Sequence, residues 1–189
     1  MPFDHFTLIA GSYDRLPPFD SDGQLEEALA LPVRGWMLDA GGGTGRVAAA
    51  LRDRTGGIVV ADISAGMLRR AAGKGLRAVR APAETTPFAA EVFERILMLD
   101  AWHHVFDQEQ TAAELWRVLA PGGRVIVVEP DIHRLSAKLI AIGEKILLMR
   151  SHFMASERIS ALFSHRGARV RVVQDGAGVI VVGEKVRQM

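Results

Sequence analysis

The residues best suited to chemistry form a glycine-rich segment with an acid at its start, Asp39-Ala40-Gly41-Gly42-Gly43-Thr44-Gly45. It lies between a predicted strand, 37–39, and a predicted helix, 46–54. Glycine permits positive φ and lets the backbone approach a ligand closely, and the first N–H groups of a helix have no partner within that helix. Ligands of open α/β sheets bind outside the carboxyl ends of the strands. The segment therefore predicts a nucleotide-type binding loop rather than a plain turn.

The spacing of this loop excludes two common kinds of nucleotide site. In the dinucleotide fingerprint G-x-G-x-x-G/A, counted from Gly41 and Gly43, the last position falls on Arg46. A P-loop is excluded because no Gly-Lys-Ser/Thr follows. The carboxylate of Asp39 would repel a pyrophosphate, whereas it would attract a cationic group. The loop thus favours a positively charged ligand.

A second acid, Asp62, ends the next predicted strand, 58–62. A carboxylate at this position can accept hydrogen bonds from the hydroxyls of a ribose. It can also stabilise the N-terminus of the helix predicted over 65–72, for which Ser64 is the expected cap. The two roles are compatible, and the position beside the glycine loop favours the ribose.

Alternating strands and helices would position these acids. Strands are predicted over 37–39, 58–62, 76–79, 95–99 and 124–128, and helices over 46–54, 65–72 and 108–119, the last one ended by Pro121-Gly122-Gly123. This alternation predicts a parallel sheet with helices on both sides. The apolar runs 170–173 and 179–182 flank a glycine-containing turn, so an antiparallel hairpin is expected to finish the sheet.

Length and composition indicate one ordinary globular domain, 1–189, with an N-terminal helical extension over 1–35. The chain is 49% hydrophobic and 24% charged, and its net charge of +1 argues against a nucleic-acid partner. It contains no cysteine, which excludes disulfides, thiolate metal sites and a cysteine nucleophile. We expect a cytoplasmic protein with no membrane partner, because no segment has the pattern of a targeting signal or a membrane span.

Five segments with recognisable patterns follow one another along the chain: Met37 to Gly45, Val59 to Leu68, Ala83-Glu84-Thr85-Thr86-Pro87-Phe88, Phe93 to Val105, and Glu114 to Arg124. In this order they resemble the class I S-adenosylmethionine-dependent methyltransferases, most closely the small-molecule branch of ubiquinone and menaquinone methylases. The likeness covers 36–129, about half of the chain. It implies an α/β fold, a Rossmann-like three-layer sandwich around a mostly parallel seven-stranded sheet that ends in an antiparallel hairpin strand. It also implies S-adenosylmethionine as the cofactor.

The resemblance implies a role for the residues at the ends of three strands. Asp39, Gly41 and Gly43 would line the methionine end of the cofactor. Asp62 would bind the ribose, and the backbone of Leu99 would face the cofactor from the end of the fourth strand.

On the adenine side, the resemblance implies that Ile63 and Met67 pack on the base, although simple core packing would explain either residue equally well. The backbone of Ala83 would meet the edge of the adenine, with Glu84 nearby. The family often places an acid before this Ala-Glu pair, to accept from the adenine amino group. Here that position is Pro82, so adenine recognition must rest on other groups.

The candidates for acid–base chemistry are His103 and His104, which follow the fourth strand at the expected crevice. Either could be a base or a substrate contact, and the alternative is a pair that lines the following helix. Tyr13 resembles an N-terminal aromatic that closes over the cofactor in this branch, or it is a surface tyrosine. Glu129 and Asp131 are expected in a solvated turn after the fifth strand, and no metal site is expected.

The expected reaction is transfer of the sulfonium methyl group to a small, partly apolar metabolite. The family inserts its substrate-binding element where this chain has a predicted helical segment, 132–165. Its apolar stripe over 135–149 would line the acceptor pocket, form a homodimer face or pack in the core. The alternatives are a non-catalytic cofactor-binding protein, which the proline at position 82 keeps open, and an NAD-dependent oxidoreductase, against which Arg46 argues.

Overall fold

The computed structural model describes residues 23–130, 154–175 and 178–187. Within them lie seven strands, β1 (Trp36–Ala40), β2 (Gly57–Asp62), β3 (Arg77–Arg80), β4 (Phe93–Leu99), β5 (Leu119–Pro130), β6 (Ala168–Asp175) and β7 (Gly178–Lys185). The helices are α2 (Gln24–Leu29), α3 (Arg46–Leu51), α4 (Ala65–Gly73), α5 (Gln108–Val118) and α7 (Ser156–Ser164), with 3-10 helices η1 (Arg52–Arg54) and η2 (Trp102–His104).

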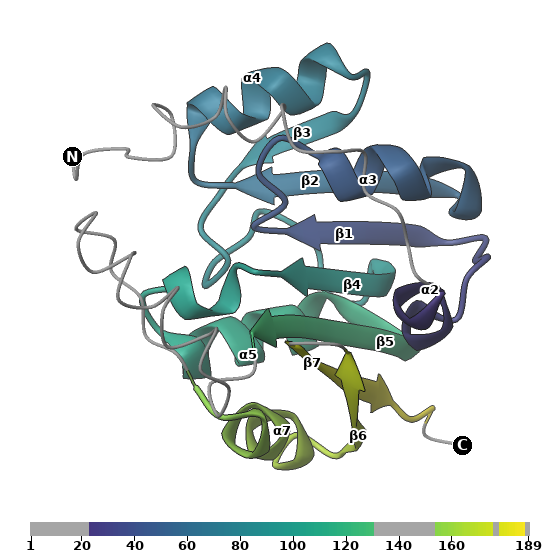
Figure 1. Ribbon diagram of the computed structural model, residues 1–189, viewed down its shortest axis with the longest axis vertical. Helices are drawn as coiled ribbons and strands as arrows, with labels where there is room; N and C mark the ends of the chain where they lie inside the picture. Colours follow the sequence, from purple (N-terminus) through teal and green to yellow (C-terminus); the bar gives the residue numbers. More distant parts are fainter. Residues whose placement is uncertain (1–22, 131–153, 176–177, 188–189) are drawn as a thin grey trace.

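The strands form one seven-stranded sheet in the order β3-β2-β1-β4-β5-β7-β6 (Figure 1). Strands β1 to β5 pair in parallel, while β7 runs antiparallel between β5 and β6. Parallel strands that run next to one another in this way carry their carboxyl ends to a common edge. The sheet reverses its order beside β1, which is where open α/β sheets bind ligands.

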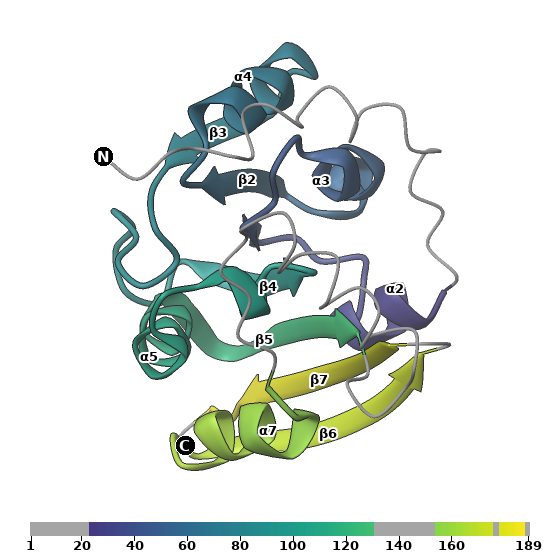
Figure 2. The same ribbon diagram turned by 60° about the vertical axis from the view of Figure 1, so that its left-hand side comes forward.

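Helices cover both faces of the sheet, which gives three layers (Figure 2). Successive side chains of a strand point to opposite faces, and in β1 Met37 packs in the core with α2, α3 and α4, whereas Leu38 packs in the core with α5 and α7. Both side chains are fully buried. The central strands are therefore apolar on both faces, as strands between two helical layers must be.

The fold confirms the sequence predictions of a mostly parallel α/β sheet and of the closing hairpin. The Ser64 cap is present, since its hydroxyl accepts from the N–H of Met67 at 3.4 Å. The helix predicted over 46–54 is wrong in its last three residues, because the α-helix ends at Leu51 and the chain continues as the 3-10 turn η1.

The fifth strand begins five residues before the predicted start at Arg124. Leu119 pairs with Phe93 and Arg124 pairs with Arg95, so residues 120–123 lie opposite Glu94 alone. The predicted helix stop at Pro121-Gly122-Gly123 is therefore a bulge inside the strand. A Cβ at Gly123 would come within 2.8 Å of the carbonyl oxygen of Ala120, so glycine is required for this bulge.

Some expectations lie outside the described residues, namely Tyr13 and most of the 1–35 extension, Asp131, the 135–149 stripe and most of the 132–165 segment. Of that last segment, the structure describes α7. Among the helices it describes, none is long and apolar enough to span a bilayer.

Candidate active site

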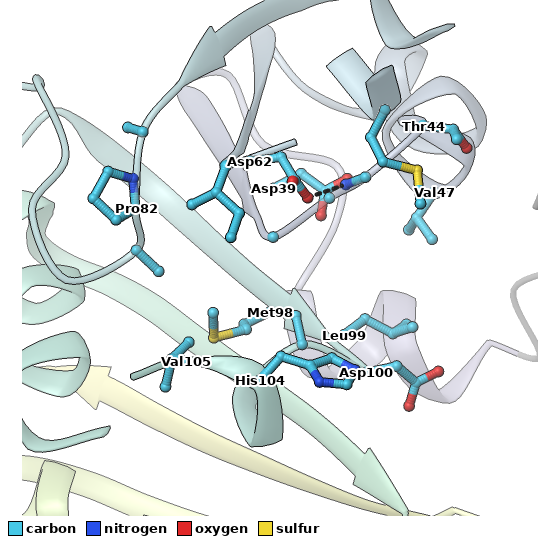
Figure 3. Close-up of a pocket in the computed structure, with 18 of the residues that line it drawn as sticks. Asp39, Thr44, Val47, Asp62, Pro82, Met98, Leu99, Asp100, His104 and Val105 are labelled. Atoms are coloured by element: carbon cyan, nitrogen blue, oxygen red, sulfur yellow. Dashed lines mark hydrogen bonds between the residues drawn. The ribbon is translucent and has the colours of Figure 1, made fainter. Parts of the chain in front are cut away.

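A pocket of about 570 Å³ opens at the carboxyl ends of β1, β2 and β4. Figure 3 shows Asp39 and Asp62 on one side of it and Met98, His104 and Val105 on the other. The residues that line it are Asp39, Gly41–Thr44, Arg46, Val47, Asp62, Ile63, Met67, Ala81–Glu84, Met98–Ala101 and His104–Phe106. The pocket thus joins the glycine loop, the ends of three strands and the segments that follow β3 and β4.

The glycine loop passes so close to its neighbours that a side chain would clash at Gly41 and at Gly42. Gly41 and Gly43 adopt positive φ, 69° and 55°. A Cβ on Gly41 would lie 2.6 Å from the Cβ of Ala101, and a Cβ on Gly42 would lie 2.4 Å from Cγ of Asp39. The glycines therefore allow the loop to pass over the carboxylate of Asp39 and beside the segment after β4.

Asp62, at the end of β2, holds the glycine loop with one carboxylate oxygen and the start of α4 with the other. Oδ2 accepts the N–H of Gly43 at 3.0 Å, and Oδ1 accepts the N–H of Ser64 at 2.7 Å. The sequence left a ribose role and a helix-terminal role open for this acid. The contact with Ser64 places it at the start of α4, and the same carboxylate lines the pocket wall, where a ligand hydroxyl would meet it.

Asp39 is a buried acid in an unusual electrostatic position. It is 2% exposed, and within the described part of the chain its Oδ2 has no hydrogen-bond partner. Burial, with a further contribution from the negative charge of Asp62, raises the pKa of Asp39 to about 7, although a backbone hydrogen bond from Ala48 acts in the opposite direction. Such a carboxyl gains most from a cation delivered into the pocket.

The residues expected to contact the adenine differ in how far their side chains are exposed to solvent. Ile63 is 57% exposed, so the core-packing alternative is wrong for it, whereas Met67 is buried in α4 and yet reaches the pocket. Pro82 and Ala83 form the wall after β3. The carboxylate of Glu84 is hydrogen-bonded to the segment that follows β4, where its Oε1 accepts the N–H of Phe106 at 2.7 Å.

The two histidines occupy different places. His104 lines the pocket, whereas His103 does not line it and is 3% exposed. His103 Nδ1 lies 2.6 Å from Oε2 of Glu129, whose Oε1 accepts the N–H of Trp102 at 3.0 Å. The two imidazole rings lie 4.0 Å apart between centroids.

The expectation of a solvated turn is wrong for Glu129, which is 3% exposed in β5 and holds η2 in place. The sequence reasoning also missed Asp100, which lines the pocket with a positive φ of 51°. Both lie at or just after the carboxyl end of a parallel strand, and that position was the available signal.

Nine candidates for cofactor binding line the pocket: Asp39, Gly41, Gly43, Asp62, Ile63, Met67, Ala83, Glu84 and Leu99.

Comparison with known proteins matches this geometry to one family. A model of the methyltransferase domain matches residues 38–127. The chain is 38% identical over 141 residues to the demethylmenaquinone methyltransferase of Thermus thermophilus, across 66% of this chain and 63% of that protein. It is 31% identical over 191 residues to the ubiquinone/menaquinone biosynthesis C-methyltransferase UbiE of Citrobacter koseri, across 90% of this chain and 76% of that protein.

The chain belongs to the class I S-adenosylmethionine-dependent methyltransferases. Its place is in the quinone-methylase-like branch, which confirms the resemblance drawn from the five motifs. The fold agrees, since the chain superposes on a protein from Haloferax volcanii, solved in complex with the Trm112 methyltransferase activator, with a TM-score of 0.81 at 18% identity across 99% of this chain and 100% of that one.

The methyltransferase therefore uses S-adenosylmethionine, and the NAD-dependent and non-catalytic alternatives are not favoured. The residues present fit this cofactor. The buried carboxyl of Asp39 meets the requirement for a group that faces a cation, and Gly41 and Gly42 stand where a Cβ would clash with Ala101 and with Asp39. Among the described residues, no group of three His, Cys, Asp or Glu side chains could hold a metal ion.

Proposed function

We propose that this methyltransferase transfers the methyl group to a ring carbon of a small, partly apolar, hydroxylated aromatic compound of the quinol type. The observation that carries the proposal is the division of the pocket into two chemically different sides. One side presents the glycine loop with Asp39 and Asp62, and the other presents apolar side chains with the imidazole of His104. The names of the similar relatives, which are a demethylmenaquinone methyltransferase and a quinone C-methyltransferase, agree with such an acceptor.

On the cofactor side, we assign Asp39 to the cationic methionine end and Asp62 to the ribose. The side chains of Ile63 and Met67, with the backbone of Ala83, would hold the adenine. When bound, the cofactor supplies a methyl group already activated by the positive charge of its sulfur. The chain itself therefore needs chiefly to align an acceptor and to exclude water.

On the acceptor side, Met98, Val105 and Phe106 would hold an apolar ring. We assign His104 as the base that takes the proton from a ring hydroxyl, because it carries the imidazole that reaches the pocket. Loss of that proton makes the neighbouring ring carbon more nucleophilic. After that carbon has gained the methyl group it gives up its own hydrogen as a proton, which restores the aromatic ring and the hydroxyl group. General-base catalysis of this kind contributes roughly 10²- to 10⁴-fold.

His103 was a second candidate for the base, and we assign it a supporting role. Its ring lies between Glu129 and His104, with Nδ1 directed to the buried carboxylate. A carboxylate at Nδ1 fixes the orientation and the tautomer of an imidazole. Glu129 and His103 would in this way hold the turn that presents His104 to the pocket.

The test is methyl transfer from S-adenosylmethionine to demethylmenaquinol analogues with short side chains, with the product located by mass spectrometry and NMR. We expect a new carbon–methyl bond. His104→Ala should lose roughly 10²-fold or more in kcat while it still binds S-adenosylhomocysteine. His165→Ala, at an exposed histidine after α7, is the matched control and should retain activity. Methylation on oxygen, or full activity of the His104 variant, would overturn the assignment.

Several further properties are proposals that rest on the sequence alone: a single domain over 1–189, a cytoplasmic location, a homodimer and no nucleic-acid partner. The near-neutral net charge supports the last of these. Size-exclusion chromatography with light scattering would test the homodimer.

A further inference from the structure

The two walls of the pocket that follow β3 and β4 are joined by one carboxylate. Glu84 lies on the wall after β3, and its Oε1 accepts the N–H of Phe106 at 2.7 Å and the N–H of Asp107 at 3.3 Å. Both donors belong to the short connection 105–107 between η2 and α5. Glu84 and Phe106 themselves line the pocket. A side chain expected beside the adenine thus holds the backbone of the opposite wall.

A second tie connects the same two segments, farther from the pocket. Oε1 of Glu114 in α5 accepts the backbone N–H of Thr86 at 2.8 Å, and Arg117 donates to both oxygens of Glu114. Burial opposes the ionisation of Glu114, but hydrogen bonds from Arg117 and Thr86 outweigh it and hold the pKa of Glu114 below its ordinary value. This buried tie anchors the segment after β3 to α5 and would do so without Glu84.

The connection 105–107 is held at its two ends, because Val105 packs against the core and the carbonyl oxygen of Asp107 accepts the N–H of Thr111 at 2.9 Å. The side chain of Phe106 is 84% exposed, so packing does not fix it, although it borders the pocket. Asp107 is occupied as the cap of α5, where its Oδ1 accepts the N–H of Gln110 at 2.9 Å. Between these two ends, Glu84 accepts the backbone N–H of Phe106 itself.

We propose that Glu84 is a positioning residue that couples the two walls, so that cofactor bound against Pro82 and Ala83 orders the connection 105–107 on the acceptor side. The inference rests on the proposed function for the adenine contact at Ala83 and for calling the other side the acceptor side. Its physical basis is the shared carboxylate. A ligand that restrains the backbone at Ala83 also restrains the adjacent Glu84, and with it the two N–H groups that Glu84 accepts.

Hydrogen exchange of the full chain, with and without saturating S-adenosylhomocysteine, tests the coupling at the amides of Phe106 and Asp107. In the unmodified chain the ligand should slow exchange at these two amides and in the glycine loop, 41–45. In Glu84→Ala, exchange at the two amides should be roughly tenfold faster, as expected for the loss of a charge-assisted hydrogen bond. The ligand should then slow exchange in the loop alone. If Glu84 had only a structural role, its loss would not abolish the slowing of exchange by the ligand at one wall while that slowing persists at the other wall.

Two further variants sharpen the result. Glu84→Gln keeps an acceptor oxygen without the charge and should give an intermediate effect on exchange. If the alanine variant folds or binds the ligand poorly, this glutamine variant is compared with the unmodified chain instead. Glu109→Ala removes an exposed carboxylate in the first turn of α5 and should match the unmodified chain. Two results would overturn the coupling. In the first, the ligand slows exchange at Phe106 and Asp107 equally in Glu84→Ala and in the unmodified chain. In the second, the ligand does not slow exchange at these amides in the unmodified chain. The measurement needs no methyl acceptor, so its result is independent of whether the substrate is a quinol.

Discussion

Replacing Asp39 by asparagine should make the cofactor-free protein more stable at neutral pH. Its pKa rises from 3.8 to about 7 on folding, chiefly through burial, and each unit is worth about 1.4 kcal/mol. Below pH 3.8 both states are protonated, and this carboxyl contributes nothing. As the pH rises to about 7 the unfolded chain ionises first, so stability falls, by about 4 kcal/mol in total. Asparagine has no proton to lose and escapes this destabilisation.

Urea unfolding of both proteins without cofactor, at pH 5 and at pH 8, measures this contribution. The stability advantage of Asp39→Asn should be about 3 kcal/mol larger at pH 8 than at pH 5, because from pH 5 to about 7 the unfolded chain is ionised at this carboxyl while the folded state still holds its proton. Asp53→Asn, at an exposed carboxylate in η1, is the control and should show little such change. Calorimetry with S-adenosylhomocysteine should show the opposite effect on function, since the variant loses the negative charge that attracts the cation.

The reasoning fails if Asp39→Asn is less stable than the unmodified protein at pH 8. It also fails if the advantage is equal at the two pH values, because the destabilisation would then not come from ionisation. In either case the buried acid would have a partner that compensates its charge, and its assignment to the cationic end of the cofactor would lose its electrostatic basis.

Two further outcomes are expected. Glu129→Ala should lower the free energy of unfolding by about 3 kcal/mol, because it leaves buried donors of Trp102 and His103 without their acceptor; chemical denaturation checks this, and a change below about 1 kcal/mol would contradict it. Pro82→Asp restores the acid that the family often has before the Ala-Glu pair, and it should tighten binding of S-adenosylhomocysteine roughly threefold to tenfold in calorimetry, whereas unchanged affinity would show that the adenine amino group lies elsewhere.

The fold and the place of the glycine loop and the two acids on the pocket wall could be predicted because their signals are local. The glycine loop, the acids that end β1 and β2, and the Ser64 cap each depend on a few consecutive residues whose conformation follows from residue type. Strand ends could be placed together because parallel strands share an edge. The bulge in β5 was missed because proline and glycine at 121–123 give the same signal for a break as for a bulge.

The sequence by itself determined which residues stand at the carboxyl edge of the sheet, since alternation of apolar runs and helical patterns fixes the topology of a parallel sheet. Only the tertiary structure decided that His104 and not His103 reaches the pocket, that Glu129 is buried against His103, and that Glu84 holds Phe106. Each of these depends on contacts across more than twenty residues, or on which side of a single turn faces the core. Local sequence patterns do not predict such contacts, because the packing of distant segments sets them.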